Sequence, residues 1–283
     1  MKTADSSLVS DLKNICGSKY ILTEAGDCWA YGYDNSRIHR TPMAVALPAN
    51  EAEVSNLIAL CCQNKITVTC RGRGTNTAGG SVPQEDGITL STERLNRITE
   101  YCPQDRYMRV QPGVTNAEVQ TMAAKHGLFW APDPTSAEVC SVGGNLSMNA
   151  AGPRAVKYGA TRNHVLGVRA VTGTGEILAT GVVTSKGVVG YDLTRLLIGS
   201  EGTLAIITEA TLQRLPRAET QSTIRLLYRD IQSATEAVSA IMCQPVVPSS
   251  LEFMDAASIA IVKQHADVNF PADTQALLMI DVE

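Results

Sequence analysis

The chain has 283 residues, of which 44% are hydrophobic and 18% charged, and its formal net charge is −4. A chain of this length buries a full hydrophobic core and has room for one large or two moderate domains. The mild acidity argues against nucleic acid as a partner, and no run of Lys and Arg indicates an anionic membrane patch. No segment has the roughly 20 apolar residues that a transmembrane helix needs. We therefore expect an ordinary soluble enzyme domain.

The N-terminal stretch and the cysteines bear on location and metal binding. The start, MKTADSSLVSDLKN, lacks the apolar core of a signal peptide, so we do not expect secretion. The eight cysteines include no C-x-x-C pair and no His/Cys ligand spacing. We expect no metal site, free and mostly buried thiols, and a cytoplasmic protein, with attachment to the inner face of a membrane as the alternative.

The first half of the chain alternates predicted helices and strands. Residues 51–64 have apolar positions at helical spacing, and residues 66–70 (ITVTC) form a short β-branched run. That run leads directly into RGRGTNTAGG at residues 71–80. Glycine lacks a Cβ, so this segment either brings backbone N–H groups close to a ligand or is only a surface turn. Its position after a strand favours a ligand, because α/β folds bind ligands at that edge of the sheet.

Strands are also predicted at residues 87–91 and 107–111. The next element is a helix over residues 116–126, with Thr115 as its N-cap and Gly127 at its end.

A second segment poor in bulky side chains, APDPTSAEVCSVGGNLSMNAAG, occupies residues 131–152. Its hydroxyl groups and freed amides can bond phosphate oxygens. Alternatively, Ser136 or Ser141 caps a helix that begins at Val142. The two roles are compatible, because amides at a helix N-terminus also bind anions.

Residues 165–172 and 176–180 are predicted to form a β-hairpin, and residues 203–211 a strand. A third glycine-rich element, GSEGTLAIIT at residues 199–208, introduces that strand. Three such separated loops indicate a large anionic ligand of dinucleotide size, held by main-chain amides rather than by basic side chains.

Beyond Pro216 the pattern changes. It predicts strands at residues 222–228, 249–253 and 276–282, and helices at residues 231–242 and 256–264. This order is typical of an antiparallel sheet backed by helices. Because the chain ends on an apolar strand, we expect one sheet edge to be unpaired.

Taken together, these segments resemble a known family. The chain is similar to the flavin-dependent oxidases and dehydrogenases of the vanillyl-alcohol oxidase / p-cresol methylhydroxylase type. Within this type it most resembles the glycolate oxidase flavoprotein subunit and the D-lactate and D-2-hydroxyglutarate dehydrogenases. The resemblance extends from about residue 42 to residue 216. It is carried in order by RGRGTNTAGGS, VQPGV, PDPTS, SVGGNLSMNAAG, KYGATRNHVLGVRAV and GYDLTRLLIGSEGTLAIITEATLQRLP.

The resemblance implies an α+β fold. Residues 1–41 form a helical lead-in, and residues 42–216 form a p-cresol methylhydroxylase-type FAD-binding domain of two α/β subdomains. Residues 217–283 begin an antiparallel α+β substrate domain, and in the family that domain continues well past this point. We therefore expect the chain to stop partway through it.

The resemblance also implies the FAD site. The first loop holds the pyrophosphate, the second contacts phosphate and ribitol, and the third contacts the adenosine or ring portion. For Glu201 a merely solvated carboxylate is the alternative. The predicted cofactor-binding residues are Arg71, Gly72, Arg73, Gly74, Thr75, Asn76, Pro134, Thr135, Ser136, Ser141, Gly143, Gly144, Asn145, Asn149, Ala150, Gly152, Glu201, Gly202, Thr203, Ile206 and Ile207.

Four positions differ from the family pattern. Arg73 stands where a small residue is usual, and Ala151 and Ala205 stand where glycine is usual. Alanine tolerates a positive φ poorly, so a left-handed backbone at either position would force the loop to shift. Thr75 occupies the position at which some members attach the flavin covalently through histidine. We therefore expect non-covalent FAD.

In complete relatives, FAD accepts a hydride from the α-carbon of a 2-hydroxy acid, such as glycolate or D-lactate, and a 2-oxo acid forms. The groups that bind substrate and deprotonate it lie in the family's C-terminal portion, so we name no catalytic residue here. For His164 we expect a satisfied structural role, with a hydrogen bond near the flavin as the alternative, and for His126 a position at a helix C-terminus.

Two alternatives are open. The chain is an FAD-binding fragment or subunit that needs a partner subunit or electron-acceptor protein, or it is another flavoenzyme class on the same FAD domain. An ether-lipid synthase and a cell-wall-precursor reductase are examples of the second.

Overall fold

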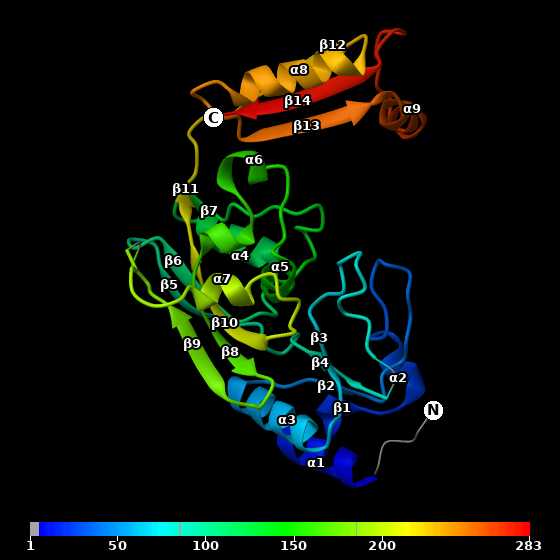
Figure 1. The fold of residues 1–283 in the computed structure, drawn as a ribbon, viewed down its shortest axis with the longest axis vertical. Coiled ribbons are helices and arrows are strands. Elements are labelled where there is room, and N and C mark those ends of the chain that lie inside the picture. Colours follow the sequence, from blue (N-terminus) through cyan, green and yellow to red (C-terminus); the bar gives the residue numbers. More distant parts are fainter. Residues whose placement is uncertain (1–5, 85, 185) are drawn as a thin grey trace.

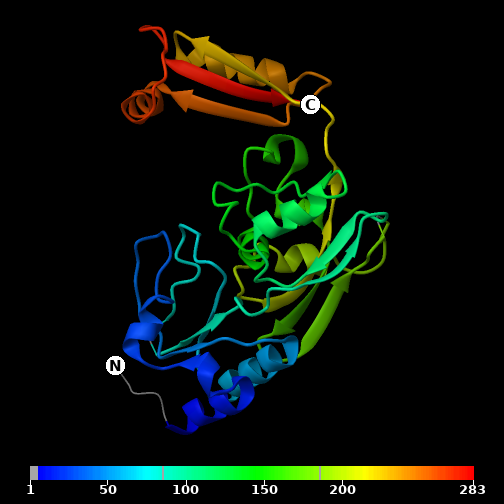
Figure 2. The same cartoon turned by 180° about the vertical axis from the view of Figure 1, so that it is seen from behind.

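The protein is elongated and has three tiers along its long axis (Figure 1, Figure 2). The computed structural model describes residues 6–84, 86–184 and 186–283. Its sheets have the strand orders β1-β2-β4-β3, β5-β6-β10-β8-β9, β11-β7 and β12-β14-β13. No helix in these described ranges is long and apolar enough to cross a membrane.

The first tier packs helices against a small, mostly parallel sheet. Strands β2, β4 and β3 are parallel, and β1 joins β2 antiparallel. Asn50 caps α3 by accepting a hydrogen bond from Glu53 N at 2.9 Å. Leu12 of α1, Leu57 of α3 and Leu90 of β4 are fully buried in the shared core. The elements are α1 (Ser6–Cys16), η1 (Ser18–Tyr20), β1 (Ile21–Leu22), α2 (Ala25–Trp29), β2 (Ala44–Ala46), α3 (Glu51–Gln63), β3 (Val68–Arg71) and β4 (Ile88–Ser91).

The second tier is built on a five-stranded antiparallel sheet with short helices beside it. Its elements are β5 (Ile98–Cys102), β6 (Tyr107–Val110), α4 (Asn116–Ala124), β7 (Leu128–Phe129), α5 (Val142–Met148), α6 (Ala155–Tyr158), η2 (Thr161–His164), β8 (Val165–Thr172), β9 (Ile177–Gly181), α7 (Leu193–Leu197), β10 (Ala205–Gln213) and β11 (Leu215–Pro216). The predicted β8–β9 hairpin is confirmed. So is the Thr115 cap of α4, which is a full capping box with Glu118. Strand β5 was not predicted.

Strand β10 links the cores of the two tiers. Ile206 is buried in the same cluster as the first-tier leucines, whereas Ile207 is buried with the second-tier residues Val142 and Leu146 of α5. Successive side chains of a strand point to opposite faces, so this one strand contributes to both cores. The arrangement places the start of β10 beside both the first glycine-rich loop and α5.

The C-terminal layer is a three-stranded antiparallel sheet with α8 on one face (Figure 1, Figure 2). It comprises β12 (Ser222–Tyr228), α8 (Ile231–Met242), β13 (Ser250–Asp255), α9 (Ala256–His265) and β14 (Ala276–Val282). The predicted strands and helices of this region are therefore confirmed to within two residues at their ends. The terminal strand β14 lies in the centre of the sheet, so the edges are β12 and β13.

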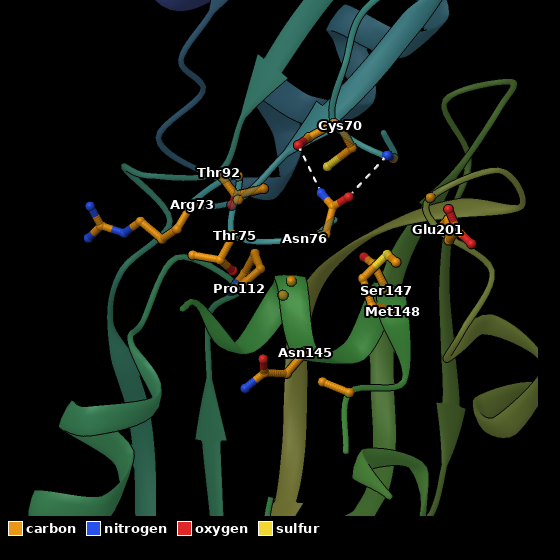
Figure 3. A pocket seen from close by; sticks show the side chains of 18 of the residues that line it. Cys70, Arg73, Thr75, Asn76, Thr92, Pro112, Asn145, Ser147, Met148 and Glu201 are labelled. Carbon is orange, nitrogen blue, oxygen red and sulfur yellow. Dashed lines mark hydrogen bonds between the residues drawn. The ribbon is translucent and has the colours of Figure 1, made fainter. Parts of the chain in front are cut away.

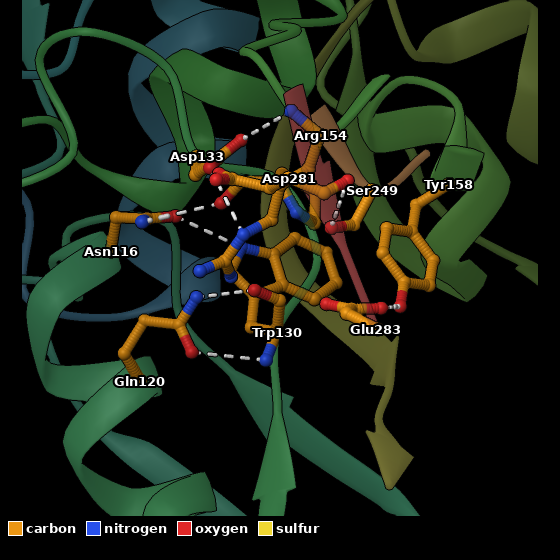
Figure 4. A network of polar contacts seen from close by, with 10 residues as sticks. Asn116, Gln120, Trp130, Asp133, Arg154, Tyr158, Ser249, Asp281 and Glu283 are labelled. Atoms are coloured by element: carbon orange, nitrogen blue, oxygen red, sulfur yellow. Dashed lines mark hydrogen bonds and ion pairs between the residues drawn. The ribbon is translucent and has the colours of Figure 1, made fainter. Parts of the chain in front are cut away.

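The C-terminal layer contacts the second tier through α6. Lys157 Nζ lies 2.8 Å from Glu283 Oε2, and the Tyr158 hydroxyl donates a hydrogen bond to the same carboxylate. Nearby, Arg154 Nε lies 3.3 Å from Asp133 Oδ2 (Figure 4). The hydrogen bonds lower the pKa of Glu283, although burial opposes them by raising it.

Candidate functional site

One cavity collects the three glycine-rich elements predicted from the sequence. It lies where the end of β3, the N-terminal part of α5 and the start of β10 meet (Figure 3). Its lining residues are Cys70, Gly72, Arg73, Gly74, Thr75, Asn76, Thr77, Gly80, Ser81, Thr92, Pro112, Pro134, Ser136, Gly143, Gly144, Asn145, Ser147, Met148, Ala150, Glu201, Gly202, Ala205, Ile206 and Ile207.

The first loop is closed on itself by Asn76. Its Oδ1 accepts hydrogen bonds from Ala78 N at 3.1 Å and Gly80 N at 3.2 Å, and its Nδ2 donates to Ser81 Oγ at 3.0 Å. Figure 3 shows this side chain bridging the loop above α5. Two positions in this loop require glycine, the first for space and the second for its backbone conformation. A Cβ at Gly72 would lie 2.5 Å from Ser141 Oγ, and Gly74 has a left-handed φ of +65°.

The second element reaches the cavity as the start of α5. Ser141 is the N-cap of α5, and its Oγ accepts a hydrogen bond from Gly144 N at 3.2 Å. Of the two serines predicted as possible caps, Ser136 and Ser141, the structure therefore shows Ser141 in this role. Gly143 packs against Pro112, since a Cβ there would lie 2.5 Å from Pro112 Cβ. At Gly144 a Cβ would meet only Ser141 Oγ, at 3.4 Å. Gly144 therefore faces open cavity, whereas Gly143 is a close-packing position.

The third element brings a carboxylate to the opposite end of the cavity from Arg73 (Figure 3). Glu201 has a φ of +55° and Gly202 a φ of +76°, so the turn before β10 is left-handed. A Cβ at Gly80 would lie 3.1 Å from Glu201 Oε2, which places this carboxylate against the first loop. Neither Ala151 nor Ala205 has a positive φ, so the two alanines do not strain the backbone.

Most predicted site residues line this cavity, and six do not: Arg71, Thr135, Ser141, Asn149, Gly152 and Thr203.

Of these, Ser141 is occupied in capping α5, and Thr203 Oγ1 donates to Ser200 O at 2.6 Å. Asn149 is the left-handed C-cap of α5, and its Oδ1 accepts from Arg162 N at 3.0 Å. Gly152 is a spacing position, since a Cβ would lie 2.0 Å from Asp133 O. Direct contact with a cofactor stays a prediction for these six and for the predicted residues that line the cavity.

The structure adds lining residues that were not among the predicted cofactor-binding residues: Cys70, Thr77, Gly80, Ser81, Thr92, Pro112, Ser147, Met148 and Ala205. All but Thr92 and Pro112 lie within or directly beside the glycine-rich segments, so proximity to those motifs was the available signal, and Pro112 lies in the VQPGV motif. Thr92 follows β4 and is buried there, with its Oγ1 3.4 Å from Arg71 O. Its place depends on the pairing of β3 with β4, which no local pattern reveals.

The lining is suited to binding rather than to proton transfer. Burial raises the pKa of the Cys70 thiol to about 12, so this thiol stays protonated and unreactive. His164 does not line the cavity. Its Nε2 lies 2.8 Å from Tyr158 O, and burial lowers its pKa, which fits the predicted structural role. His126 packs edge-on against Tyr101, with ring centroids 5.2 Å apart. Across the described ranges, no cluster of His, Cys, Asp or Glu could hold a metal ion.

Comparisons with known proteins agree on the class of this site. The family model described as "FAD binding domain" matches residues 42–181, and the model described as "FAD linked oxidases, C-terminal domain" matches residues 217–283. Solved structures of alkyldihydroxyacetonephosphate synthase superpose with a TM-score of 0.81, covering 99% of this chain and 56% of the synthase at 21% identity. The fold is therefore an FAD-binding fold of the p-cresol methylhydroxylase type, and the cofactor is FAD.

The chain belongs to the FAD-linked oxidase family. It is 38% identical to the glycolate oxidase subunit GlcD of Bacillus subtilis, over 89% of this chain and 54% of that protein. It is 37% identical to a D-lactate dehydrogenase of Archaeoglobus fulgidus, over 82% of this chain and 53% of that protein. A D-2-hydroxyglutarate dehydrogenase of Stutzerimonas stutzeri is 32% identical, over 95% of this chain and 58% of that protein. The chain thus spans about half the length of the curated relatives it matches.

The residues present fit a bound dinucleotide. Its phosphates need donors in a space free of Cβ atoms, and residues 72–76 and the open face at Gly144 provide such a space. Among the described lining residues the one carboxylate is that of Glu201, which lies at the opposite end of the cavity from Arg73.

Proposed function

We propose that this chain is the FAD-binding part of an oxidoreductase that oxidises a 2-hydroxy acid of the glycolate or D-lactate type to the 2-oxo acid. The observation that carries the proposal is the convergence of the three glycine-rich elements on one cavity. The similarity to a glycolate oxidase subunit, a D-lactate dehydrogenase and a D-2-hydroxyglutarate dehydrogenase supports the substrate class.

Different lining residues hold different parts of FAD. The backbone of residues 72–76 binds the pyrophosphate, and Pro134, Ser136 and the start of α5 contact the ribityl chain. Residues 201–207 hold the adenosine portion at the other end. FAD, when bound, supplies the acceptor for the hydride that leaves the α-carbon of the substrate. Thr75 stands where some family members attach the flavin through histidine, so this arrangement holds FAD non-covalently.

The composition of this cavity also supports separate cofactor-binding and substrate-binding regions in the complete protein. Turnover requires groups that orient the carboxylate and remove the hydroxyl proton. Among the residues that the structure describes, the lining contains no histidine, lysine or tyrosine, and its only carboxylate is Glu201. We infer that residues 42–216 bind the cofactor and that residues 217–283 begin the substrate domain. The substrate-binding groups then come from other polypeptide, in the same protein or in a partner subunit. A cytoplasmic location is part of this proposal.

The experiment has two stages on the purified chain. First, bound flavin is quantified from the visible spectrum, then released by acid precipitation and identified chromatographically. We expect FAD in the supernatant; flavin that stays with the precipitate would contradict the non-covalent site, and FMN would contradict the dinucleotide site. Second, glycolate, D-lactate and D-2-hydroxyglutarate are added anaerobically while flavin bleaching is followed.

We expect little bleaching with the isolated chain and rapid bleaching when the polypeptide that supplies the substrate groups is present. Bleaching by none of the three acids in that complete assembly would contradict the substrate class. It would favour another flavoenzyme class on the same FAD domain. Rapid bleaching in the isolated chain would place the catalytic groups within these residues.

A further inference from the structure

Arg71 lies beneath the first glycine-rich loop rather than in the cavity. It ends β3, is only 8% exposed, and its Nη1 donates a hydrogen bond to Tyr33 O at 2.5 Å. The Tyr31 and Tyr33 rings lie 5.9 and 5.7 Å from its Cζ. Aromatic faces stabilise a cation at this range, so the guanidinium is held in a fixed place.

The guanidinium stands directly against the loop backbone at Gly74. A Cβ at Gly74 would lie 2.5 Å from Arg71 Nη2 and 2.8 Å from Cζ. Gly74 lines the cavity and Arg71 does not, so the main chain at Gly74 separates the buried cation from the ligand space. The absent side chain of Gly74 is what allows this close approach.

The charge of Arg71 is incompletely neutralised. Among the described residues it forms no ion pair with a carboxylate. The buried Asp34 accepts instead from Ser36 N at 2.9 Å and from Ser81 N and Oγ at 3.4 Å. Burial lowers the pKa of Arg71, against the opposing electrostatic effects of Tyr33, Tyr31 and the carboxylates of Asp34 and Glu93, neither of which forms an ion pair with it. A buried cation without a close counter-ion is costly unless an anion approaches it.

Arg73, two residues further on, is a contrasting case. It lines the cavity rim and is exposed, and in the described part of the chain it makes no hydrogen bond or ion pair. Its side chain extends outward from the loop, away from α5 (Figure 3). Water and salt screen such an exposed charge far more than a buried one.

We propose that Arg71 is a positioning residue for the FAD pyrophosphate. Its guanidinium holds the loop at Gly74 and provides a positive charge on the side of the loop backbone that faces away from the cavity. The exposed Arg73 contributes little to FAD affinity. The inference rests on the proposed FAD site and adds to it which of the two loop arginines fixes the dinucleotide. It assigns a role to the segment from Tyr31 to Ser36, which supports Arg71 and the loop from outside the cavity.

The test compares Arg71→Met with Arg73→Met in the full chain, with FAD and riboflavin as ligands. Dissociation constants come from flavin fluorescence titrations of flavin-free protein. Opposite unit charges about 7 Å apart, at an effective dielectric constant of about 20, change a dissociation constant by more than tenfold. We expect Arg71→Met to weaken FAD binding by about that factor or more and to leave riboflavin binding nearly unchanged, since riboflavin has no phosphate. Arg73→Met should change FAD binding by less than about threefold at physiological salt.

Arg71→Lys distinguishes the effect of losing the positive charge from an effect of the substitution on folding. It keeps a cation but not the planar guanidinium, so we expect it to recover part of the FAD affinity that Arg71→Met loses. Equal losses for FAD and riboflavin in Arg71→Met, or no recovery in Arg71→Lys, would show a purely structural role and overturn the proposal. So would a larger effect of Arg73→Met than of Arg71→Met. FAD binding by the unaltered chain is measured separately; its absence would refute the cofactor site itself rather than the role of Arg71 within it.

Discussion

Gly144→Val tests whether the glycine at this position leaves space for the cofactor. In the structure a Cβ at Gly144 meets only Ser141 Oγ at 3.4 Å, so the valine side chain projects into the cavity. Helix α5 loses nothing by the change, because valine is a somewhat better helix former than glycine. We therefore expect the free energy of unfolding of the flavin-free protein to change by less than about 0.5 kcal/mol.

The expected effect on FAD is much larger. The added methyl groups occupy space that phosphate or ribityl atoms would fill, so at least one hydrogen bond between the loops and a charged group is lost. Such a bond is worth about 1.5–3 kcal/mol, which corresponds to roughly a 10- to 100-fold weaker dissociation constant. The assay is a flavin titration together with thermal unfolding of the flavin-free protein, because bound FAD would itself raise the Tm.

Gly143→Ala is the matched control. Its Cβ would lie 2.5 Å from Pro112 Cβ and 3.0 Å from Pro112 O, so the backbone must move. Overpacking of this kind costs about 1–3 kcal/mol and lowers the Tm of the flavin-free protein by several degrees. If Gly144→Val lowered the Tm as much as Gly143→Ala while its surviving fold bound FAD normally, the segment would be only a turn and our interpretation of α5 would be wrong.

Three further results are expected. Thr75→Ala should leave all flavin extractable by acid, as in the unaltered chain; a change in the extractable fraction would implicate Thr75 in a flavin link. Thr115→Ala should lower the free energy of unfolding by about 1 kcal/mol, measured by urea denaturation, because α4 loses its cap. Glu283→Gln should destabilise the contact with Lys157 by up to about 1 kcal/mol at neutral pH. Because the pKa of Glu283 in the folded protein is lowered from 4.5, this difference should be complete at higher pH, decline as the pH falls through the lowered pKa and vanish below it; a difference that does not decline on acidification would contradict it.

The sequence by itself determined the elements whose signals are local. Thr115 and Glu118 are three residues apart, so a capping box can be read from the chain alone, and α4 begins where it predicts. The apolar runs of β12 and β14 and the helical spacing of α8 likewise needed no long-range information. The glycine-rich segments were visible as motifs because their composition leaves backbone exposed, whatever surrounds them.

Only the tertiary structure decided what each residue in those motifs does. Gly143 and Gly144 are adjacent, and both line the cavity, yet an added Cβ would collide with Pro112 at Gly143 and has space at Gly144. Arg71 and Arg73 belong to the same motif, yet β3 buries the first beneath the loop and leaves the second exposed. The tyrosines that hold Arg71 come from a segment about 40 residues earlier, and Thr92 reaches the cavity through the pairing of β3 with β4. Such contacts depend on which strands pair and which faces they bury. Those choices are made by the packing of the whole chain, because the free energy gained by burial is shared among residues far apart in sequence.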